Sequence, residues 1–515
     1  MLEILIKNAL VIDGSGKKPY YADVGIKEDR IVTPVKNDIP AKKVINANGL
    51  CLAPGFIDIH THSELSLLVN PTAESKLYQG VTTEVVGNCG FSAAPVEGDA
   101  AIKLSERLAE YNRDLNWRSF AEYIKELTSR DIAPNVLSFV GQGTLRQSIM
   151  GMENRRSSRV ELKRMKSMLA QALEAGAVGL SSGLAYPPSS YANKAELIEL
   201  TKIVSFYDKV YAIHLRDEGA RLIDAVKEAL DIAYQSKVSL QISHHKVLGL
   251  DNQSLIKESL NLIKEARANG LDVNCDIYPY LASQTTLSSL LPQDIFAGGQ
   301  QATRKKLARK KEEVIAYLLR NYGANFGTKI VFLAGERRGK SLEQLAKEND
   351  LNWAEILIEI ILTAKSSISI LKFNITKETI TEVLTSEFSM VASDAMARKK
   401  DDKQLAKNLC HPRTYGAFSK VINHYVREGI LSLATAIAKM TSLPAKKLGL
   451  RRGLIKDNYP ADLILFDLDQ FKDHATYKKP HLYTTGIKYL FINGKLIIKN
   501  EALLTGKNSG LYLKN

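Results

Sequence analysis

The stretch PGFIDIHTH at residues 54–62 decides the fold, because it is a short apolar run that ends in two histidines. Its side chains Asp58, His60 and His62 alternate along the chain. Residues two apart in a β-strand share a face, so these three side chains can converge where the strand ends. Two imidazoles and a carboxylate suit a divalent metal, although an ordinary buried strand with hydrogen-bonded histidines also explains an isolated HxH pattern.

Short apolar runs alternate with longer helical patterns through the middle of the chain, which is typical of parallel βα units. In the helical segment 158–175, for example, apolar residues recur at helical spacing, Ser158 can cap the start and Gly176 follows the end. The candidate strands are residues 55–60, 82–86, 135–140, 177–182, 210–215, 238–243, 272–277 and 390–393. These strands predict an α/β fold, a (β/α)8 barrel, while residues 329–332 remain a ninth candidate.

Both ends of the chain differ from this middle part, because they consist of short strand patterns joined by turns. The N-terminal end contains the turn Asp13-Gly14-Ser15-Gly16, and the C-terminal end contains the hairpin turn Asn493-Gly494. We therefore expect a small β-sandwich built from residues 1–53 and 441–515. The barrel would occupy residues 54–440, with an insertion over its mouth at 285–345.

The composition is that of a globular protein, with 515 residues of which 45% are hydrophobic and 24% charged. The net charge is +14, but the basic residues are spread over amphipathic segments such as 304–311, which favours a solvated surface over a nucleic-acid partner. The four cysteines are far apart in the chain, so we expect no disulfide framework and a reducing compartment. No stretch resembles a signal peptide or a transmembrane helix, so we expect a cytoplasmic protein without a membrane partner, and the oligomeric state stays open.

Reactive side chains gather at the predicted C-terminal ends of the strands, where barrel enzymes carry their active sites. In chain order they are His60, His62, Cys89, His214, His244, Tyr278 and Asp394. The chain has only nine histidines, and five of them (His60, His62, His214, His244 and His245) fall at these strand ends. This concentration of imidazoles beside a cysteine predicts a metal site.

Seven motifs follow one another along the chain: GFIDIHTH, GNCGFSAAP (87–95), AIHLRDEG (212–219), ISHHK (242–246), DIYPY (276–280), SDAM (393–396) and HPRTYG (411–416). Together they resemble the amidohydrolase superfamily and, more narrowly, the N-acyl-D-amino-acid deacylases, or D-aminoacylases. The resemblance extends to GLIKDNYPADLILFD at 453–467. It implies a zinc-dependent enzyme in which metal-bound hydroxide cleaves a small N-acyl-D-amino acid to a carboxylate and a free D-amino acid.

The resemblance also implies two metal positions. The tightly bound zinc would be held by Cys89, His214 and His244, and a second, weaker position would be formed by His60 and His62. Gly87 and Gly90 place Cys89 in a tight loop where its thiolate can reach a metal, although a mid-chain cysteine is more often a buried apolar residue. We expect His244 to face the metal, and His245 to pack elsewhere, because adjacent strand residues face opposite ways.

Further roles concern proton transfer and substrate binding. Asp394 would move a proton from the attacking water to the departing amine, unless it caps a helix. Tyr278 would donate to the developing oxyanion, and alternation would put the hydroxyl of Tyr280, a further substrate-binding candidate, on the same side. The Arg413 fork suits the substrate α-carboxylate, unless Arg413 forms a surface ion pair. Lys246 would meet a substrate carboxylate or be solvated.

Three positions depart from the family pattern and bear on substrate preference. Gln142 replaces the histidine of a Gly-His turn, Gln284 stands in a segment that usually reads Thr-Ala-Gly-Ser-Thr, and Ala395 replaces a glycine. The alternative enzyme is a cyclic amidase of the dihydroorotase or hydantoinase type. Those relatives usually bridge two metals with a carbamylated lysine after the fourth strand, where this chain has Ser181 and Ser182. A non-catalytic binding protein of the same fold is a further alternative, which the complete ligand set disfavours.

Overall fold

The computed structural model describes residues 1–515 except 36–38, 365–366, 402–407, 505, 507 and 515. Within these residues, the centre of the molecule is a barrel of eight parallel strands that follow one another in chain order. They are β6 (Phe56–Asp58), β7 (Val81–Val86), β8 (Asn135–Ser138), β10 (Gly179–Gly183), β11 (Val210–His214), β12 (Ser239–Ile242), β13 (Val273–Ile277) and β17 (Ser389–Val391). The predicted (β/α)8 barrel is therefore confirmed.

Two hydrogen-bonded sets of strands close on each other to complete the barrel. One set contains β6, β7 and β8, and the other contains the remaining barrel strands with the short β9 (Val140–Gly141) at its edge. At one seam, the Val178 N–H donates to the Ser138 carbonyl at 3.0 Å. At the other seam, the Asp394 N–H donates to the His60 carbonyl at 2.9 Å, so the first and last strands of the barrel meet beside the predicted site.

Helices surround the barrel in the order expected for βα units. They are α1 (Ser66–Val69), α2 (Glu74–Leu77), α3 (Gly98–Ala109), α4 (Phe120–Thr128), α5 (Gln142–Met150), α6 (Arg159–Ala175), α7 (Lys194–Phe206), α8 (Leu222–Ser236), α9 (Leu255–Ala268), α14 (Lys377–Thr385), α15 (Arg413–Lys420), α16 (Leu433–Met440) and α17 (Ser442–Lys447). Helix α6 begins where the sequence predicts, because Ser158 and Glu161 form a reciprocal capping box. It ends at Gly176, whose φ of 112° is left-handed.

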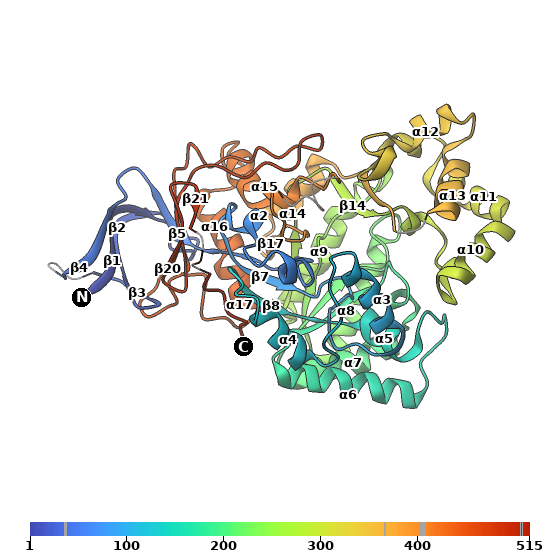
Figure 1. Cartoon of the computed structure of the whole chain (residues 1–515), viewed down its shortest axis with the longest axis horizontal. Coiled ribbons are helices and arrows are strands. Elements are labelled where there is room, and N and C mark those ends of the chain that lie inside the picture. The colour runs from blue at the N-terminus through green and yellow to red at the C-terminus, as the bar shows by residue number, and fades with distance from the viewer. Residues whose placement is uncertain (36–38, 365–366, 402–407, 505, 507, 515) are drawn as a thin grey trace.

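Strands from both ends of the chain form one nine-stranded sheet within the described residues. Its strands are β1 (Leu2–Val11), β2 (Tyr20–Lys27), β3 (Arg30–Val32), β4 (Ala41–Asn46), β5 (Cys51–Pro54), β18 (Leu463–Phe466), β19 (Ile487–Ile492), β20 (Lys495–Lys499) and β21 (Ala502–Leu503). The two ends meet where β5 pairs antiparallel with β18. Residues from both ends, such as Ile26 and Leu465, share one hydrophobic core. The expected small β domain therefore exists and lies at one end of the molecule (Figure 1).

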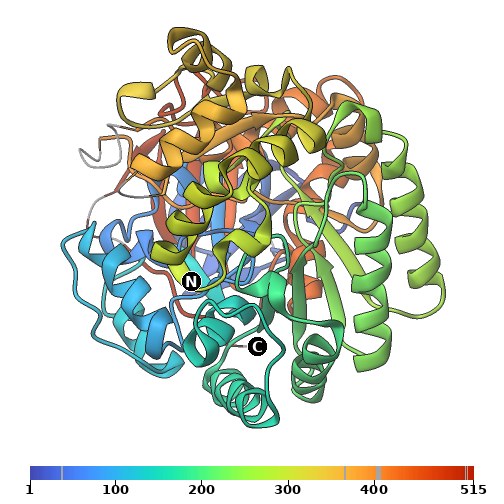
Figure 2. The same cartoon turned by 90° about the vertical axis from the view of Figure 1, so that its right-hand side faces the viewer.

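A second small unit lies at the opposite end of the molecule (Figure 1) and stands in front of the barrel in Figure 2, in yellow to light orange. It begins and ends with the antiparallel strands β14 (Ala282–Thr286) and β16 (Ser369–Phe373), and β15 (Ile330–Phe332) pairs with β16. Its helices are α10 (Gly299–Arg309), α11 (Lys311–Tyr322), α12 (Leu342–Glu348) and α13 (Trp353–Thr363). The ninth candidate strand thus lies outside the barrel, and the unit is longer than the expected interval 285–345.

Two observations concern the environment of the protein. None of the helices in the described ranges is long and apolar enough to span a membrane. All four cysteines are described, and all of them are free thiols.

The junction between the β domain and the barrel depends on Asp462, a buried carboxylate beside β18. It accepts hydrogen bonds from Arg452, from the Asn493 N–H at 2.8 Å and from the Asn135 amide of β8 at 3.3 Å. Asp462→Ala leaves the mostly buried Arg452 guanidinium without this partner, so we expect the free energy of unfolding to fall by about 3–5 kcal/mol. Urea denaturation measures the loss.

The control for this prediction is Glu106→Ala, which removes an ion pair with Lys103 in which both side chains are more than half exposed. Its free energy of unfolding should change by less than about 0.5 kcal/mol, because exposed pairs contribute little. Equal effects of the two substitutions would contradict the assignment of Asp462 to the junction.

Candidate active site and metal centre

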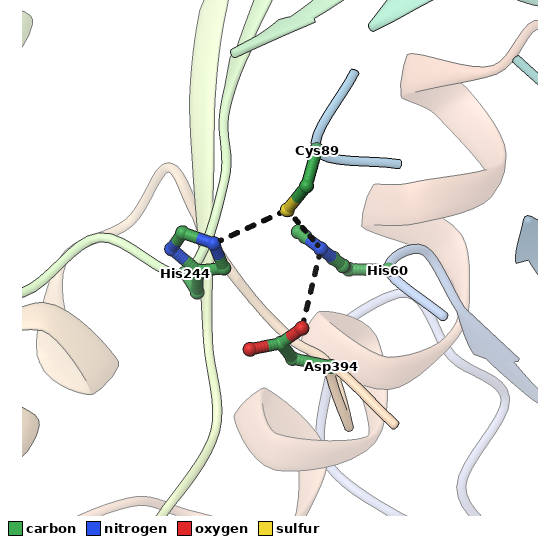
Figure 3. Close-up of side chains that lie close together, drawn as sticks. All are labelled: His60, Cys89, His244 and Asp394. Atoms are coloured by element: carbon green, nitrogen blue, oxygen red, sulfur yellow. Dashed lines mark hydrogen bonds and ion pairs between the residues drawn. The ribbon is translucent and has the colours of Figure 1, made fainter. Parts of the chain in front are cut away.

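The Cys89 thiol is the centre of a cluster of imidazoles at the C-terminal ends of the barrel strands. Its Sγ lies 3.3 Å from His60 Nε2, 3.4 Å from His244 Nε2 and 3.6 Å from His214 Nδ1. Figure 3 shows Cys89, His60 and His244 pointing toward one another, with Asp394 beside them. The fold therefore brings together side chains from the C-terminal ends of five barrel strands: β6, β7, β11, β12 and β17.

The loop that carries Cys89 is held by a serine of the fourth barrel strand. Ser181 Oγ donates to the Gly87 carbonyl at 2.5 Å and accepts from the Gly90 N–H at 3.1 Å. It therefore binds the backbone on both sides of the cysteine. Cys89 itself has a left-handed φ of 53°. A Cβ on Gly90 would lie 2.6 Å from the backbone nitrogen of Gly183, so this close approach requires glycine. Ser181 thus fixes the loop that carries Cys89.

His244 reaches the cluster because the chain turns sharply after β12. The strand ends at Ile242, and His244 has a left-handed φ of 35°. Its backbone N–H donates to Asp276 Oδ1 at 2.8 Å, which fixes the turn. His245 instead points to α9, where its Nε2 lies 2.6 Å from Ser259 Oγ. The structure brings together His244 and Cys89 as expected, although the cause is a turn and not strand alternation.

Asp394 joins the cluster from the end of the last barrel strand. One carboxylate oxygen lies 3.0 Å from His62 Nε2 and 3.5 Å from His60 Nε2, and the other lies 2.7 Å from Arg413 Nη1. Burial alone would raise the pKa of this carboxyl, but Arg413 and His62 hold that pKa well below its usual value. No helix begins in residues 395–401, so Asp394 does not cap a helix there.

Arg413 is the first residue of α15 and is buried, so it is not a surface ion pair. Its guanidinium carbon lies 4.3 Å from the centre of the Tyr278 ring. His411 fixes the backbone at the start of this helix, because its Nδ1 accepts from the Arg413 backbone N–H at 3.0 Å while its Nε2 donates to the Ala282 carbonyl at 2.8 Å. The buried Tyr278 hydroxyl makes no hydrogen bond of normal geometry with the described residues, which leaves it able to donate to a ligand.

Lys246 is buried in an ion pair. Of the two alternatives that the sequence allowed for it, a solvated side chain is therefore excluded. Its Nζ donates to Glu218 Oε1 at 2.5 Å and lies 3.0 Å from His244 Nδ1. Glu218 also lies 3.8 Å from His214 Nε2. Burial alone would raise the pKa of Glu218, but Lys246 and the two histidines hold that pKa well below its usual value.

Sequence reasoning missed Glu218 and Asp276, which both orient metal-ligand candidates. Asp276 Oδ1 lies 3.3 Å from His60 Nδ1, so this contact directs the other ring nitrogen of His60 toward Cys89. The signals were present in the motifs: Glu218 follows His214 by four residues in HLRDEG, and Asp276 is the one carboxylate of the buried strand VNCDI.

Two expectations about side-chain direction were wrong. Asp58 does not join the histidines, because its carboxylate binds the buried Lys76 ammonium at 2.8 Å. Strand alternation does not apply to Tyr278 and Tyr280, because β13 ends at Ile277. The Tyr280 hydroxyl donates to the Pro412 carbonyl at 3.4 Å, and its ring packs 5.1 Å from that of His411.

The glutamines that depart from the family pattern are built into hydrogen-bond networks. The buried Gln142 amide donates to Glu196 at 3.0 Å and accepts from Ser189, while Arg146 pairs with the same Glu196 at 2.6 Å. Gln284 accepts from the His411 N–H at 3.3 Å. Both departures thus have structural partners beside the site.

The donor set fits a metal such as zinc, which accepts thiolate and imidazole ligands. The described residues contain two groups whose candidate ligand atoms lie within 4.8 Å of one another: His60, Cys89, His244 and Asp394 form one, and His214, Glu218 and His244 form the other. Burial alone would raise the pKa of Cys89, but the neighbouring histidines hold it well below its usual value, which favours the thiolate that binds metals. His62 contacts Asp394 and belongs to neither group among the described residues.

Comparison with known proteins gives full-length matches. Two models of the amidohydrolase family match the chain, one over residues 43–205 and the other over residues 378–497. D-aminoacylase from Alcaligenes xylosoxydans xylosoxydans is 32% identical over 99% of this chain and 97% of the relative. N-acyl-D-glutamate deacylase from the same organism is 33% identical, over 96% and 93%.

A solved structure extends these matches to three dimensions. N-acyl-D-glutamate deacylase from Bordetella bronchiseptica, complexed with zinc and a phosphonate inhibitor that mimics the tetrahedral intermediate, matches with a TM-score of 0.84 at 29% identity. The match covers 100% of both chains. This chain therefore belongs to the amidohydrolase family, in the group that contains D-aminoacylase and the N-acyl-D-amino-acid deacylases.

Proposed function

We propose that this protein is a zinc-dependent amidohydrolase that cleaves N-acyl-D-amino acids to a carboxylate and a free D-amino acid. The observation that carries the proposal is the convergence of three histidines on Cys89, beside the carboxylate of Asp394, in a chain that is similar to D-aminoacylase over its full length. Thiolate, imidazole and carboxylate together supply both metal ligands and a proton acceptor.

Cys89, His214 and His244 would hold the first zinc ion, and His60 and His62 would form a second, weaker position next to Asp394. The Cys89 Sγ lies within 3.6 Å of imidazoles from both sets, so the thiolate would border both positions. A zinc ion would lower the pKa of a water molecule and polarise the scissile carbonyl. Asp276 would hold the orientation of the His60 ring, and Glu218 would hold those of the His214 and His244 rings, through contacts with the ring nitrogens.

Asp394 would accept a proton from the attacking water and deliver it to the departing amine. Its carboxylate is held at two points, since His62 contacts one oxygen and Arg413 the other. A carboxylate fixed in this way stays ionised and keeps one direction in the site, as a general base requires.

The cations beside the cluster would bind the substrate. Arg413 offers a planar fork to the α-carboxylate, and Lys246 adds a second positive charge from the other side of His244. The Tyr278 hydroxyl would donate to the oxyanion of the acyl group. Because these groups are buried, their interactions with a charged substrate are stronger than they would be in water.

A hydrolysis screen tests the reaction class. We expect release of free amine from N-acetyl-D-amino acids, with much slower release from the L-enantiomers and from cyclic ureides such as hydantoins and dihydroorotate. The absence of a lysine at the end of the fourth barrel strand, where this chain has Ser181 and Ser182, motivates the last expectation, since cyclic amidases usually have a bridging lysine there. Turnover of the ureides alone would replace the proposed function by a cyclic amidase.

The metal assignment predicts the effect of Cys89→Ala. The variant should lose most of its zinc and at least about 100-fold in kcat, because the thiolate is the ligand around which the imidazoles gather. Elemental analysis and hydrolysis assays measure the two effects. Cys51→Ala is the matched control, since Cys51 is a buried thiol of β5 in the small β domain. An unchanged zinc content in Cys89→Ala would refute the site.

The proton-transfer assignment predicts the effect of Asp394→Asn. The amide preserves shape and can still contact His62, but it cannot accept a proton. We expect zinc at the first position and a nearly normal KM, with kcat lowered by about 10²–10⁴-fold. Steady-state kinetics at saturating zinc measures kcat and KM separately. A kcat close to that of the unchanged protein would show that another group moves the proton.

A further inference from the structure

Lys76 is a fully buried lysine of α2 whose contacts surround Asp394. Its Nζ donates to Asp58 Oδ2 at 2.8 Å, to Ser393 Oγ at 2.6 Å and to the Ala395 carbonyl at 2.9 Å. An ammonium group has three N–H donors, so these three acceptors use all of them. Two of the acceptors belong to the residues immediately before and after Asp394.

Further hydrogen bonds tie the same segment to the first barrel strand. The Ser393 N–H donates to Asp58 Oδ1 at 3.0 Å, and the Ala395 N–H donates to Ser393 Oγ at 3.2 Å. Asp58 is the last residue of β6, and Ser393 follows β17. The pair of Lys76 and Asp58 thus forms a polar clamp across the seam where the barrel closes.

The backbone at Asp394 needs such a clamp. Its φ of 49° is left-handed, which is unfavourable for residues other than glycine. A backbone of this kind persists only when the surrounding structure determines it. The contacts of Lys76 with Ser393 and Ala395 supply that determination on both sides of the carboxylate.

The chemistry of the clamp argues against a purely packing role. Lys76 lies 3.7 Å from a second buried carboxylate, Glu84, in addition to Asp58. Burial of these charges is costly, and an apolar side chain of similar volume commonly gives equal or greater stability. An ammonium does what an apolar side chain cannot, because it fixes three oxygen atoms in defined directions.

We propose that Lys76 is a positioning residue for hydrolysis: its ammonium holds Ser393 and Ala395 so that the Asp394 carboxylate stays beside His60 and Arg413. The proposal rests on the proposed function, because it assigns Lys76 an effect only through the proton transfer by Asp394.

Lys439 of α16 offers a matched control, because it contacts the other end of β17. It is also a buried lysine, and its Nζ donates to the Ser389 carbonyl at 3.1 Å and to Ser389 Oγ at 3.0 Å. Ser389 is the first residue of β17, whereas the residues that Lys76 holds follow the end of that strand. Lys439→Met therefore removes a buried ammonium of α16 that contacts β17, without touching the segment around Asp394.

The experiment compares Lys76→Met, Lys439→Met, Asp394→Asn and the double variant Lys76→Met/Asp394→Asn by zinc content, Tm, kcat and KM. We expect Lys76→Met to keep its zinc and its KM within about threefold but to lose about 100-fold in kcat, because small displacements of a catalytic group are costly. Lys439→Met should lower Tm and keep kcat. The double variant should be no slower than Asp394→Asn alone, since Lys76 acts through Asp394.

An unchanged kcat in Lys76→Met, an equal loss of kcat in Lys439→Met, or a further loss in the double variant would each overturn the positioning role. If Lys76→Met does not fold, Ser393→Ala removes one acceptor without isolating a buried charge. It should lower kcat several-fold at constant KM, and an unchanged kcat would again overturn the proposal. A normal kcat in Asp394→Asn would instead overturn the proton-transfer assignment itself, so the two failures are distinguishable.

Discussion

The closure of the barrel between β6 and β17 is the constraint on which the site depends. At this seam the Asp394 N–H donates to the His60 carbonyl at 2.9 Å, and Thr61 pairs with Ala395 in a parallel bridge. One metal-ligand candidate and the proposed proton acceptor therefore become neighbours only when the first and last strands meet. The polar clamp of Lys76 and Asp58 lies at the same seam. The contacts that close the barrel therefore also set the geometry of the site.

Left-handed turns after the strands direct three side chains into the site. They occur at Cys89, His244 and Asp394, with φ values of 53°, 35° and 49°. Each turn is held by a polar side chain from a neighbouring element: Ser181, Asp276 and Lys76, respectively. Hydrogen bonds from residues behind the site thus offset the unfavourable left-handed backbone of the reactive residues. Such an arrangement is common at functional sites.

Charge pairing explains how so many ionic groups are buried at one end of the barrel. Arg413 pairs with Asp394, and Lys246 pairs with Glu218, so both cations proposed for substrate binding already have an anionic partner. An incoming carboxylate would share these cations with the protein. Since buried ions are stable only when they are paired, the site is prepared for an anionic ligand without carrying an isolated charge.

The sequence by itself determined the barrel, its strand order and most of the residues around Cys89. Hydrophobic periodicity identifies strands and helices, and parallel strands bring their C-terminal ends together, so reactive residues at those ends could be located in advance. Only the tertiary structure decided that Asp58 binds Lys76, that the Tyr280 hydroxyl donates to the Pro412 carbonyl, and that Glu218 joins the cluster. These outcomes depend on turns beyond the strand ends and on contacts between distant segments, which periodicity along the chain does not encode.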